Sequence, residues 1–123
     1  MAGGLAALQG RWKIDYLEVA GSQVPASAFA GAGVTVSGDT FESTGMGSVY
    51  RGRLSLSEEG GRKIFSLSFE AGPEKGNVNN ALYELDGDSW TFCIDTKGGP
   101  APIALASTSA NGYALERLTR VSS

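Results

Sequence analysis

Apolar and polar residues alternate in short runs along most of this chain. In the stretch "RWKIDYLEV", the residues Trp12, Ile14 and Tyr16 fall at every second position. Successive side chains of a β-strand point to opposite faces, so this spacing predicts a strand with these three side chains on one face. The same spacing recurs at Tyr50, Leu54 and Leu56, at Phe65, Leu67 and Phe69, at Ala81, Tyr83 and Leu85, and at Trp90, Phe92 and Ile94.

Shorter segments complete the pattern. We expect short strands at residues 34–36 and 40–43, and a weak strand at Ile103–Ala106. The last strand is expected in "YALERLTRV", residues 113–121, which gives a total of eight or nine strands. The chain contains 18 Gly, which lie in and between these runs and predict turns. Only "VPASAFAGA" has the composition for a short helical turn, near residues 25–31, which Ser27 can cap.

Two similar sequences, "VSGDTF" and "LDGDSW", predict tight hairpins. Their centres are Gly38-Asp39 and Gly87-Asp88. Gly at the first central position is what a type II′ turn requires, and this turn sets Val36 opposite Phe41 and Leu85 opposite Trp90. A type I′ turn centred on Asp86-Gly87 is the alternative, and it would set Leu85 against Asp88. A calcium loop is excluded, because its last ligand position would fall on Lys97 instead of Glu.

Consecutive hairpins with one apolar face must close into a barrel or stack as a sandwich to bury that face. A closed barrel removes both sheet edges, and we favour it for that reason. The predicted fold is all-β: a small antiparallel up-and-down β-barrel of eight to nine strands, with at most one short helical turn. Residues 8–121 form this single domain, and residues 1–7 are expected to be a disordered N-terminal segment.

Charge and composition limit the partners. With 123 residues and a net charge of -3, the chain lacks the positive field that nucleic-acid binding requires. Its opening, "MAGGLAALQG", has no Lys or Arg, and its apolar run is too short for a membrane span or a signal peptide. We expect a soluble, cytoplasmic protein that binds neither membrane nor nucleic acid. Removal of a signal peptide would leave the same kind of opening.

The absence of His from the sequence excludes Ser-His-Asp and Cys-His nucleophile systems and a His-held haem. Cys93 is the single cysteine, so no internal disulfide can form. It lies in the same predicted strand as Trp90 and Phe92 but on the opposite face, and we expect it to be a packed, unreactive thiol. The sequence therefore assigns no catalytic residue, no metal site and no cofactor.

Taken in order, "LQGRWKIDYLEVAGSQVP", "VSGDTF", "EAGPEKGNVNNALYELDGDSWTFCID" and "LERLTR" resemble a family of uncharacterised bacterial lipocalin-like domains that is expanded in planctomycetes. The resemblance spans about residues 8–120. In lipocalins, the Trp of a G-x-W motif plugs one end of the barrel and an Arg of the last strand packs across it. The resemblance therefore implies that Trp12 is a structural plug and that Arg120 lies over its ring. It implies the barrel and leaves the ligand open.

The first hypothesis for function is a barrel that binds a small apolar or aromatic molecule. The candidate ligand-binding residues are Tyr16, Tyr50, Arg51, Phe65, Tyr83, Phe92 and Leu115, with Arg51 orienting a polar group of the ligand. The competing interpretation is that the same aromatic side chains fill the interior solidly. The loop Glu70–Asn77, "EAGPEKGN", is either a connector or a lid at the barrel mouth.

Two further hypotheses belong to other classes. An enzyme of the cyclase or isomerase type could use a shaped pocket with Tyr83 and Glu18 as proton-transfer groups. An interaction or structural domain could act through its outer surface or through the weak strand Ile103–Ala106, which Pro100 and Pro102 flank. A monomer or a weak homodimer is expected. Of the three, we favour ligand binding, and an enzyme is the less favoured alternative.

Overall fold

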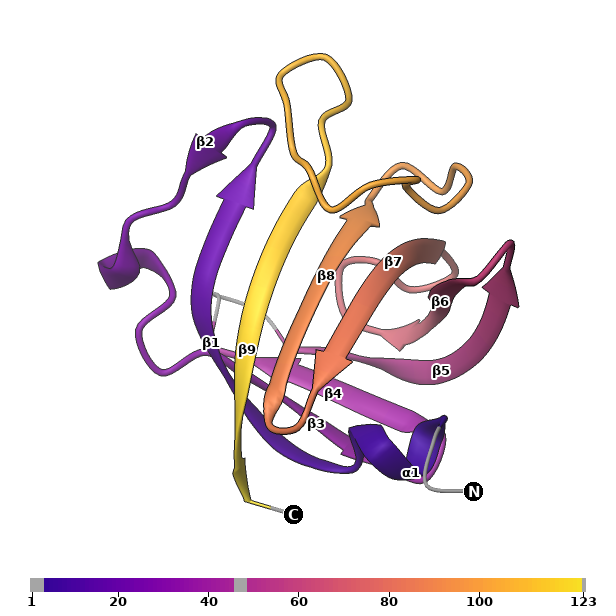
Figure 1. Ribbon diagram of the computed structural model, residues 1–123. Coiled ribbons are helices and arrows are strands. Elements are labelled where there is room, and N and C mark those ends of the chain that lie inside the picture. Colours follow the sequence, from indigo (N-terminus) through magenta and orange to yellow (C-terminus); the bar gives the residue numbers. More distant parts are fainter. Residues whose placement is uncertain (1–3, 46–48, 123) are drawn as a thin grey trace.

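A computed structural model describes residues 4–45 and 49–122, in which eight antiparallel strands wrap into a closed barrel (Figure 1). The barrel strands are β1 (Gly10–Val19), β3 (Gly33–Ser37), β4 (Thr40–Thr44), β5 (Tyr50–Glu59), β6 (Arg62–Ala71), β7 (Val78–Asp86), β8 (Ser89–Asp95) and β9 (Ala114–Ser122). Each pairs with the next in sequence, and β1 pairs with β9 to close the barrel. The short β2 (Ser22–Gln23) pairs only with the end of β1. The predicted all-β up-and-down barrel is confirmed.

Both predicted hairpin turns are present. Val36 pairs with Phe41 in the β3–β4 hairpin, and Leu85 pairs with Trp90 in the β7–β8 hairpin. Gly38 has a φ of 61° and Gly87 a φ of 59°, while the Asp that follows each has a negative φ. A positive φ at the first central residue alone is the property of a type II′ turn. The Gly-Asp pairs therefore reverse the chain.

A β-bulge in β1 reverses the predicted orientation of Tyr16. The pairing of β1 with β9 shifts register between Ile14 and Tyr16, so the alternation of side chains changes phase there. Trp12 and Ile14 are buried in the core, but the next inward residue is Leu17. The prediction that Tyr16 shares the inner face is wrong, because the bulge carries one extra residue.

Two short helical turns accompany the barrel. The η1 turn (Ala26–Ala28) lies within the predicted region 25–31, but Pro25 precedes it and Ser27 does not cap it. The α1 turn (Leu5–Leu8) was not predicted, and residues 1–7 were expected to be disordered. That expectation is wrong for residues 5–7, because Leu8 is fully buried and anchors the turn against the barrel. Residues 1–3 lie outside the described part of the chain.

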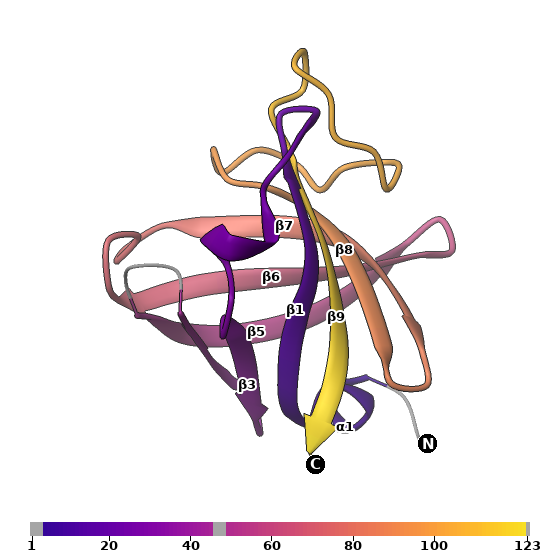
Figure 2. The same cartoon turned by 90° about the vertical axis from the view of Figure 1, so that its left-hand side faces the viewer.

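The segment between β8 and β9, residues 96–113, contains no strand, so the predicted strand Ile103–Ala106 is wrong. The segment forms turns near the top of the barrel in the views of Figures 1 and 2. Pro102 is buried, and the carbonyl of Ala106 accepts a hydrogen bond from Cys93 Sγ at 3.6 Å. The proline-rich segment is therefore a cover for the outer side of the sheet instead of a free edge strand.

One end of the barrel is closed by Trp12 and Arg120, as the family resemblance implied. The Arg120 guanidinium lies 4.3 Å from the centre of the Trp12 ring. It also donates to the carbonyls of Ala7 and Gln9 and pairs with Asp88 at 2.8 Å. The Trp12 indole N–H donates to the Leu8 carbonyl at 2.9 Å. These contacts fix α1 across the end of the barrel.

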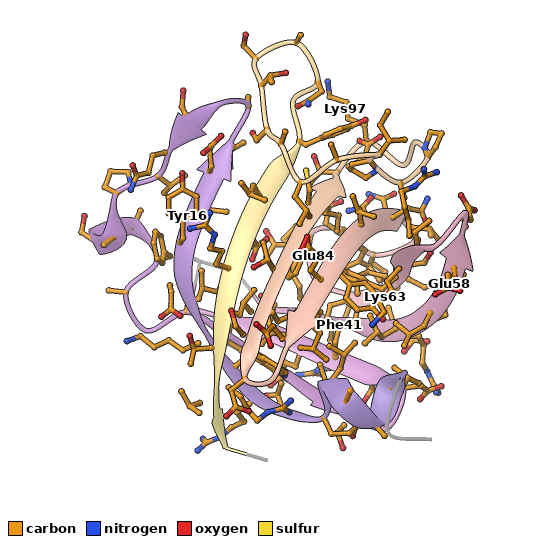
Figure 3. All side chains as sticks on the ribbon, in the orientation of Figure 1. Tyr16, Phe41, Glu58, Lys63, Glu84 and Lys97 are labelled. Atoms are coloured by element: carbon orange, nitrogen blue, oxygen red, sulfur yellow. The ribbon has the colours of Figure 1, made fainter. Side chains whose placement is uncertain are left out.

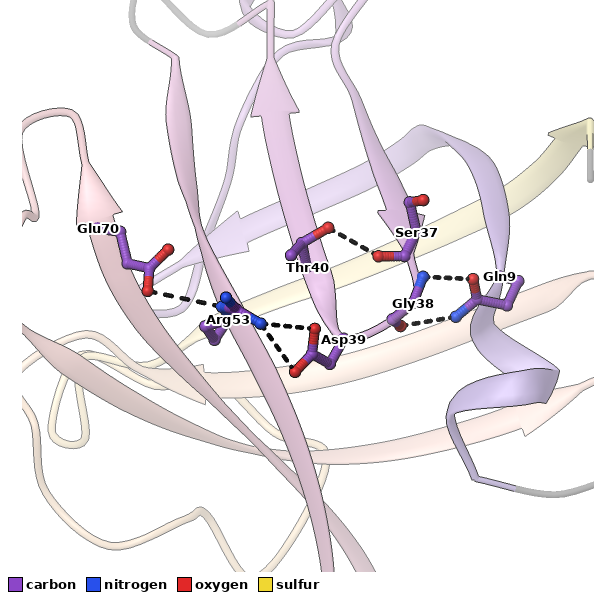
Figure 4. Close-up of polar contacts among 7 residues, drawn as sticks. All are labelled: Gln9, Ser37, Gly38, Asp39, Thr40, Arg53 and Glu70. Carbon is purple, nitrogen blue, oxygen red and sulfur yellow. Dashed lines mark hydrogen bonds and ion pairs between the residues drawn. The ribbon is translucent and has the colours of Figure 1, made fainter.

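A second set of polar contacts ties the chain entering β1 to the β3–β4 turn (Figure 4). The Gln9 side chain donates to the carbonyl of Gly38 at 2.8 Å and accepts from its N–H at 2.7 Å. Beside them, Arg53 of β5 contacts Asp39 at 2.9 Å and Glu70 at 3.6 Å. The closed end is therefore held by contacts between residues far apart in sequence.

Candidate ligand-binding cavity

The barrel interior is hollow beyond the plug. A partly open cavity of about 280 Å³ lies between the plug and the opposite end of the barrel. Its apolar lining consists of Leu17, Val19, Val34, Phe41, Tyr50, Leu54, Phe65, Leu67, Phe69, Trp90, Phe92, Ile94 and Ala114. Space of this size, lined by apolar and aromatic side chains, is near the lower limit for small-molecule pockets, which begin at roughly 300 Å³.

Three of the predicted binding residues line this cavity. Tyr50 comes from β5, Phe65 from β6 and Phe92 from β8, and their alternating neighbours point outward. Tyr83 of β7 is also buried in the core, where its ring lies 5.7 Å from that of Phe65, but it does not line the cavity. Period-two alternation therefore located part of the site.

The other three predicted residues lie outside the barrel wall. Tyr16, labelled in Figure 3, donates to Glu18 at 2.5 Å, and the Arg117 guanidinium lies 5.1 Å from the centre of its ring. Arg51 is exposed and pairs with Glu42 at 2.8 Å, so it cannot orient an enclosed ligand. Leu115 is buried on the outer side, where it pairs with Cys93. Their predicted placement inside the barrel is wrong. The bulge in β1 turns Tyr16 outward, Leu115 lies on the face of β9 opposite Glu116, and Arg51 directly follows the inward-facing Tyr50 on β5.

Aromatic rings form the floor of the cavity. The ring of Trp90 lies 5.2 Å from that of Trp12, 5.6 Å from that of Phe65 and 5.2 Å from that of Phe92. Tilted and edge-on contacts at these distances are favourable and hold the rings in place. The plug and the floor are thus one continuous aromatic cluster, which keeps the space above it from collapsing.

Glu116 places a carboxyl group on the apolar wall. It lies on β9 between Leu17 of β1 and Phe92 of β8, which pair with it from either side. Protein surrounds the carboxyl, and the surface that it retains borders the cavity. Burial raises the pKa of Glu116 to about 7, because the apolar surroundings disfavour its charged form. Among residues 4–45 and 49–122, no hydrogen bond or ion pair satisfies it.

A second unsatisfied polar group lies on the same lining. Asn79 of β7 is 3% exposed, and its Oδ1 has no hydrogen-bond partner in the part of the chain that the structure describes. The indole N–H of Trp90 is likewise without a partner among those residues. Most buried polar groups are hydrogen-bonded, so unpaired ones next to an empty space require an explanation. A bound ligand or water would supply it.

The wider end of the cavity is formed by strand ends and by the β6–β7 loop. Glu74, in the predicted loop Glu70–Asn77, lines the cavity, and its carboxylate accepts a hydrogen bond from Asn77. Three exposed valines, Val19, Val49 and Val78, lie at strand ends on this side of the barrel. The loop thus borders the cavity, whereas its use as a lid stays a prediction.

Sequence reasoning missed Glu116 and Asn79, although a signal for Glu116 was present. An Arg120 side chain over Trp12 must lie on the inner face of β9, and a period of two then puts Leu118, Glu116 and Ala114 on that face as well. In this alternation Leu115 falls on the outer face of β9, so the prediction that it binds a ligand inside the barrel was inconsistent with the position of Arg120. Asn79 similarly continues the inward series of Ala81 and Tyr83 toward the wide end.

Comparison with known proteins gives no family assignment: no protein-family model, curated protein or solved structure matches this chain. Among the described residues, no helix has the length and apolar character needed to cross a membrane. The cavity and its lining are therefore the basis for a functional assignment.

Proposed function

We propose that this protein is a lipocalin-like barrel that binds one small, largely apolar molecule in its interior. The observation that carries the proposal is the cavity of about 280 Å³ behind an aromatic floor. A concave apolar space with a few polar groups is the usual form of a small-molecule site. The exposed valines at the wide end favour capture of an apolar molecule from water, because they extend the apolar lining to the surface.

Calorimetric titration with octan-1-ol tests the proposal, since this neutral probe needs only apolar space and one hydrogen bond. We expect saturable binding to a single site, with a change in tryptophan fluorescence because Trp90 lines the cavity. Ala114→Leu adds methyl groups to the lining and should weaken binding by at least about tenfold. Ala110→Leu makes the same change on an exposed loop and should leave binding unchanged. Equal binding by both variants, or none by the wild type, would contradict the proposal.

Native mass spectrometry of protein purified from its own host identifies the natural ligand. We expect a reproducible additional mass that is lost in Ala114→Leu and kept in Ala110→Leu. A bare protein mass in all samples, together with no octan-1-ol binding, would favour the interpretation that the molecule acts through its surface.

An enzyme that uses the same pocket is a second candidate, favoured by one observation. Glu116 has a pKa near 7 inside an apolar cavity, which suits a general acid or base. The predicted pair of Tyr83 and Glu18 does not serve, because Glu18 faces outward and bonds Tyr16. Conversion of a co-purified ligand by the wild type, but not by Glu116→Gln, would support catalysis. Release of the ligand unchanged would support binding alone.

A further inference from the structure

We infer that the ligand of this cavity carries a basic nitrogen, and that its ammonium group pairs with the Glu116 carboxylate inside the barrel. This inference rests on the proposed binding function and names the chemical class of the ligand. The alternation of β9 directs the Glu116 carboxyl inward, on the same face as Ala114 and Leu118.

The side chains around Glu116 carry no positive charge. The inward neighbours on the two adjoining strands are Leu17 and Phe92, and neither bears a charge. The titratable groups that line the cavity are Tyr50, Glu74 and Glu116, and none of the described lining residues is Lys or Arg. A carboxyl enclosed in protein is costly in its charged form unless a cation pairs with it. None of the described lining residues supplies that cation, so a cationic ligand would stabilise the charged form of Glu116.

The sign of the charge discriminates between ligand classes. A fatty acid would bring a third carboxylate close to Glu116 and Glu74, and like charges in an apolar space repel one another strongly. A neutral alcohol can bond to the protonated carboxyl but gains no ion pair. An inorganic cation would need several oxygen ligands, and Leu17 and Phe92 flank Glu116 where those would have to be. An organic amine satisfies the carboxyl and fills the apolar space.

Asn79 and Glu74 on the same lining fit this ligand as well. Asn79 Oδ1 is a hydrogen-bond acceptor without a donor among the described residues, and an amine or hydroxyl on the ligand can donate to it. Glu74 at the wide end adds negative charge where a ligand would enter, which attracts a cation and repels an anion. The site therefore combines acceptors and negative charge with apolar walls.

Proton exchange distinguishes this pairing from simple apolar binding. An alkylammonium group has a pKa close to that of a Lys side chain, about 10.4, so it stays charged at pH 6 and pH 8. At pH 6 the free protein holds a proton on Glu116, and that proton must pass to the buffer when the ammonium binds. Affinity for an amine should therefore fall by roughly fivefold as pH drops from 7 to 6, with little change between pH 8 and 9.

The experiment compares octylamine, octan-1-ol and octanoate by calorimetry at pH 6 and pH 8, in buffers of different ionisation enthalpy. We expect octylamine to bind at least about tenfold more tightly than octan-1-ol at pH 8, and octanoate to bind most weakly. Octylamine should release close to one proton at pH 6 and almost none at pH 8. Octan-1-ol should release none at either pH.

Matched variants assign the effect to one carboxyl. Glu116→Gln keeps the shape of the side chain and should abolish both the preference for octylamine and the proton release, while octan-1-ol still binds. Glu84→Gln removes the same charge from the exposed face of β7 (Figure 3) and should change neither. Equal affinity of the wild type for octylamine and octan-1-ol, or a preference that survives in Glu116→Gln, would overturn the inference while the binding function stands. Failure of both probes to bind the wild type would overturn both.

Discussion

At the scale of single residues, the most unusual feature of the cavity is Glu116, because it places a carboxyl group among apolar side chains. Burial raises the pKa of its carboxyl to about 7, and no described residue offers it a partner. A residue that opposes the stability of the empty protein and faces an open space is typical of a binding site. By contrast, the Arg120 guanidinium forms an ion pair with Asp88 and donates hydrogen bonds to the carbonyls of Ala7 and Gln9.

The Glu116 side chain should make the stability of the empty protein depend on pH. Below about pH 4.5, the carboxyl is protonated in both the folded and the unfolded state and has no effect. As pH rises through about 7, the folded state loses up to roughly 3 kcal/mol, because the unfolded state ionises more easily. Urea unfolding should therefore show Glu116→Gln to be more stable than the wild type at pH 8 and nearly equal to it at pH 4. A constant difference at both pH values would contradict the assigned pKa.

At the scale of the elements, irregularities in the strands decide which side chains face the cavity. The shift in β1 sends Tyr16 outward and Leu17 inward. A second shift separates Arg51 and Gly52 in the pairing of β5 with β6, where the two backbones approach closely. A Cβ atom on Gly52 would lie 2.0 Å from the carbonyl oxygen of Ser68. Gly52 therefore permits a bend that no other residue could occupy without moving the strand.

Gly52→Ala should destabilise the barrel more than a substitution that strains only a turn. We expect a loss of roughly 3 kcal/mol or more in the free energy of unfolding, because the backbone of β6 must move. Gly60→Ala is the matched control: it has a φ of +57° and no atom within 4 Å of the added Cβ. Its expected loss is about 1 kcal/mol, from the backbone conformation alone. Similar losses in both variants, measured by urea unfolding, would show that the close approach is not limiting.

At the scale of the whole molecule, apolar side chains are buried on both sides of one part of the sheet. The inner core is the barrel interior, and the outer side buries Ile64, Leu82, Cys93 and Leu115. Ser107 links the covering segment 96–113 to the turn after β1, because its hydroxyl accepts from the Gly21 N–H at 2.8 Å. The same hydroxyl donates to the Tyr113 carbonyl at 2.7 Å, within the segment. Because this segment contributes no strand to the barrel, we expect it to open while the barrel stays folded.

The reactivity of Cys93 should report this opening. The thiol is fully buried, and burial raises its pKa, so a disulfide reagent should label it only when the cover opens. Ser107→Ala removes two hydrogen bonds and should raise the labelling rate by roughly tenfold, with the barrel still folded by circular dichroism. Ser109→Ala, at an exposed position in the same segment, should leave the rate unchanged. Fast labelling of the wild type would show that the segment does not protect the thiol.

Much of the fold could be predicted from local chemistry. Period-two alternation and the Gly-Asp turns are short-range signals, and they specified the barrel, the hairpin registers and the inward positions of Tyr50, Phe65 and Phe92. Two of the errors at the site have different causes. Tyr16 was misplaced because a bulge leaves no reliable mark in the sequence, and Leu115 because an apolar residue can be buried on either side of a sheet.

The sequence by itself determined the class of fold, because the alternation of side chains and the preference of Gly for a positive φ act over a few residues. Only the tertiary structure decided that the interior keeps a cavity, that Glu116 lies on its wall without a partner, and that residues 96–113 cover the outer face. The physical reason is that packing and the desolvation of a charge depend on what surrounds a residue from distant parts of the chain. Those neighbours are set when β1 meets β9 and the barrel closes.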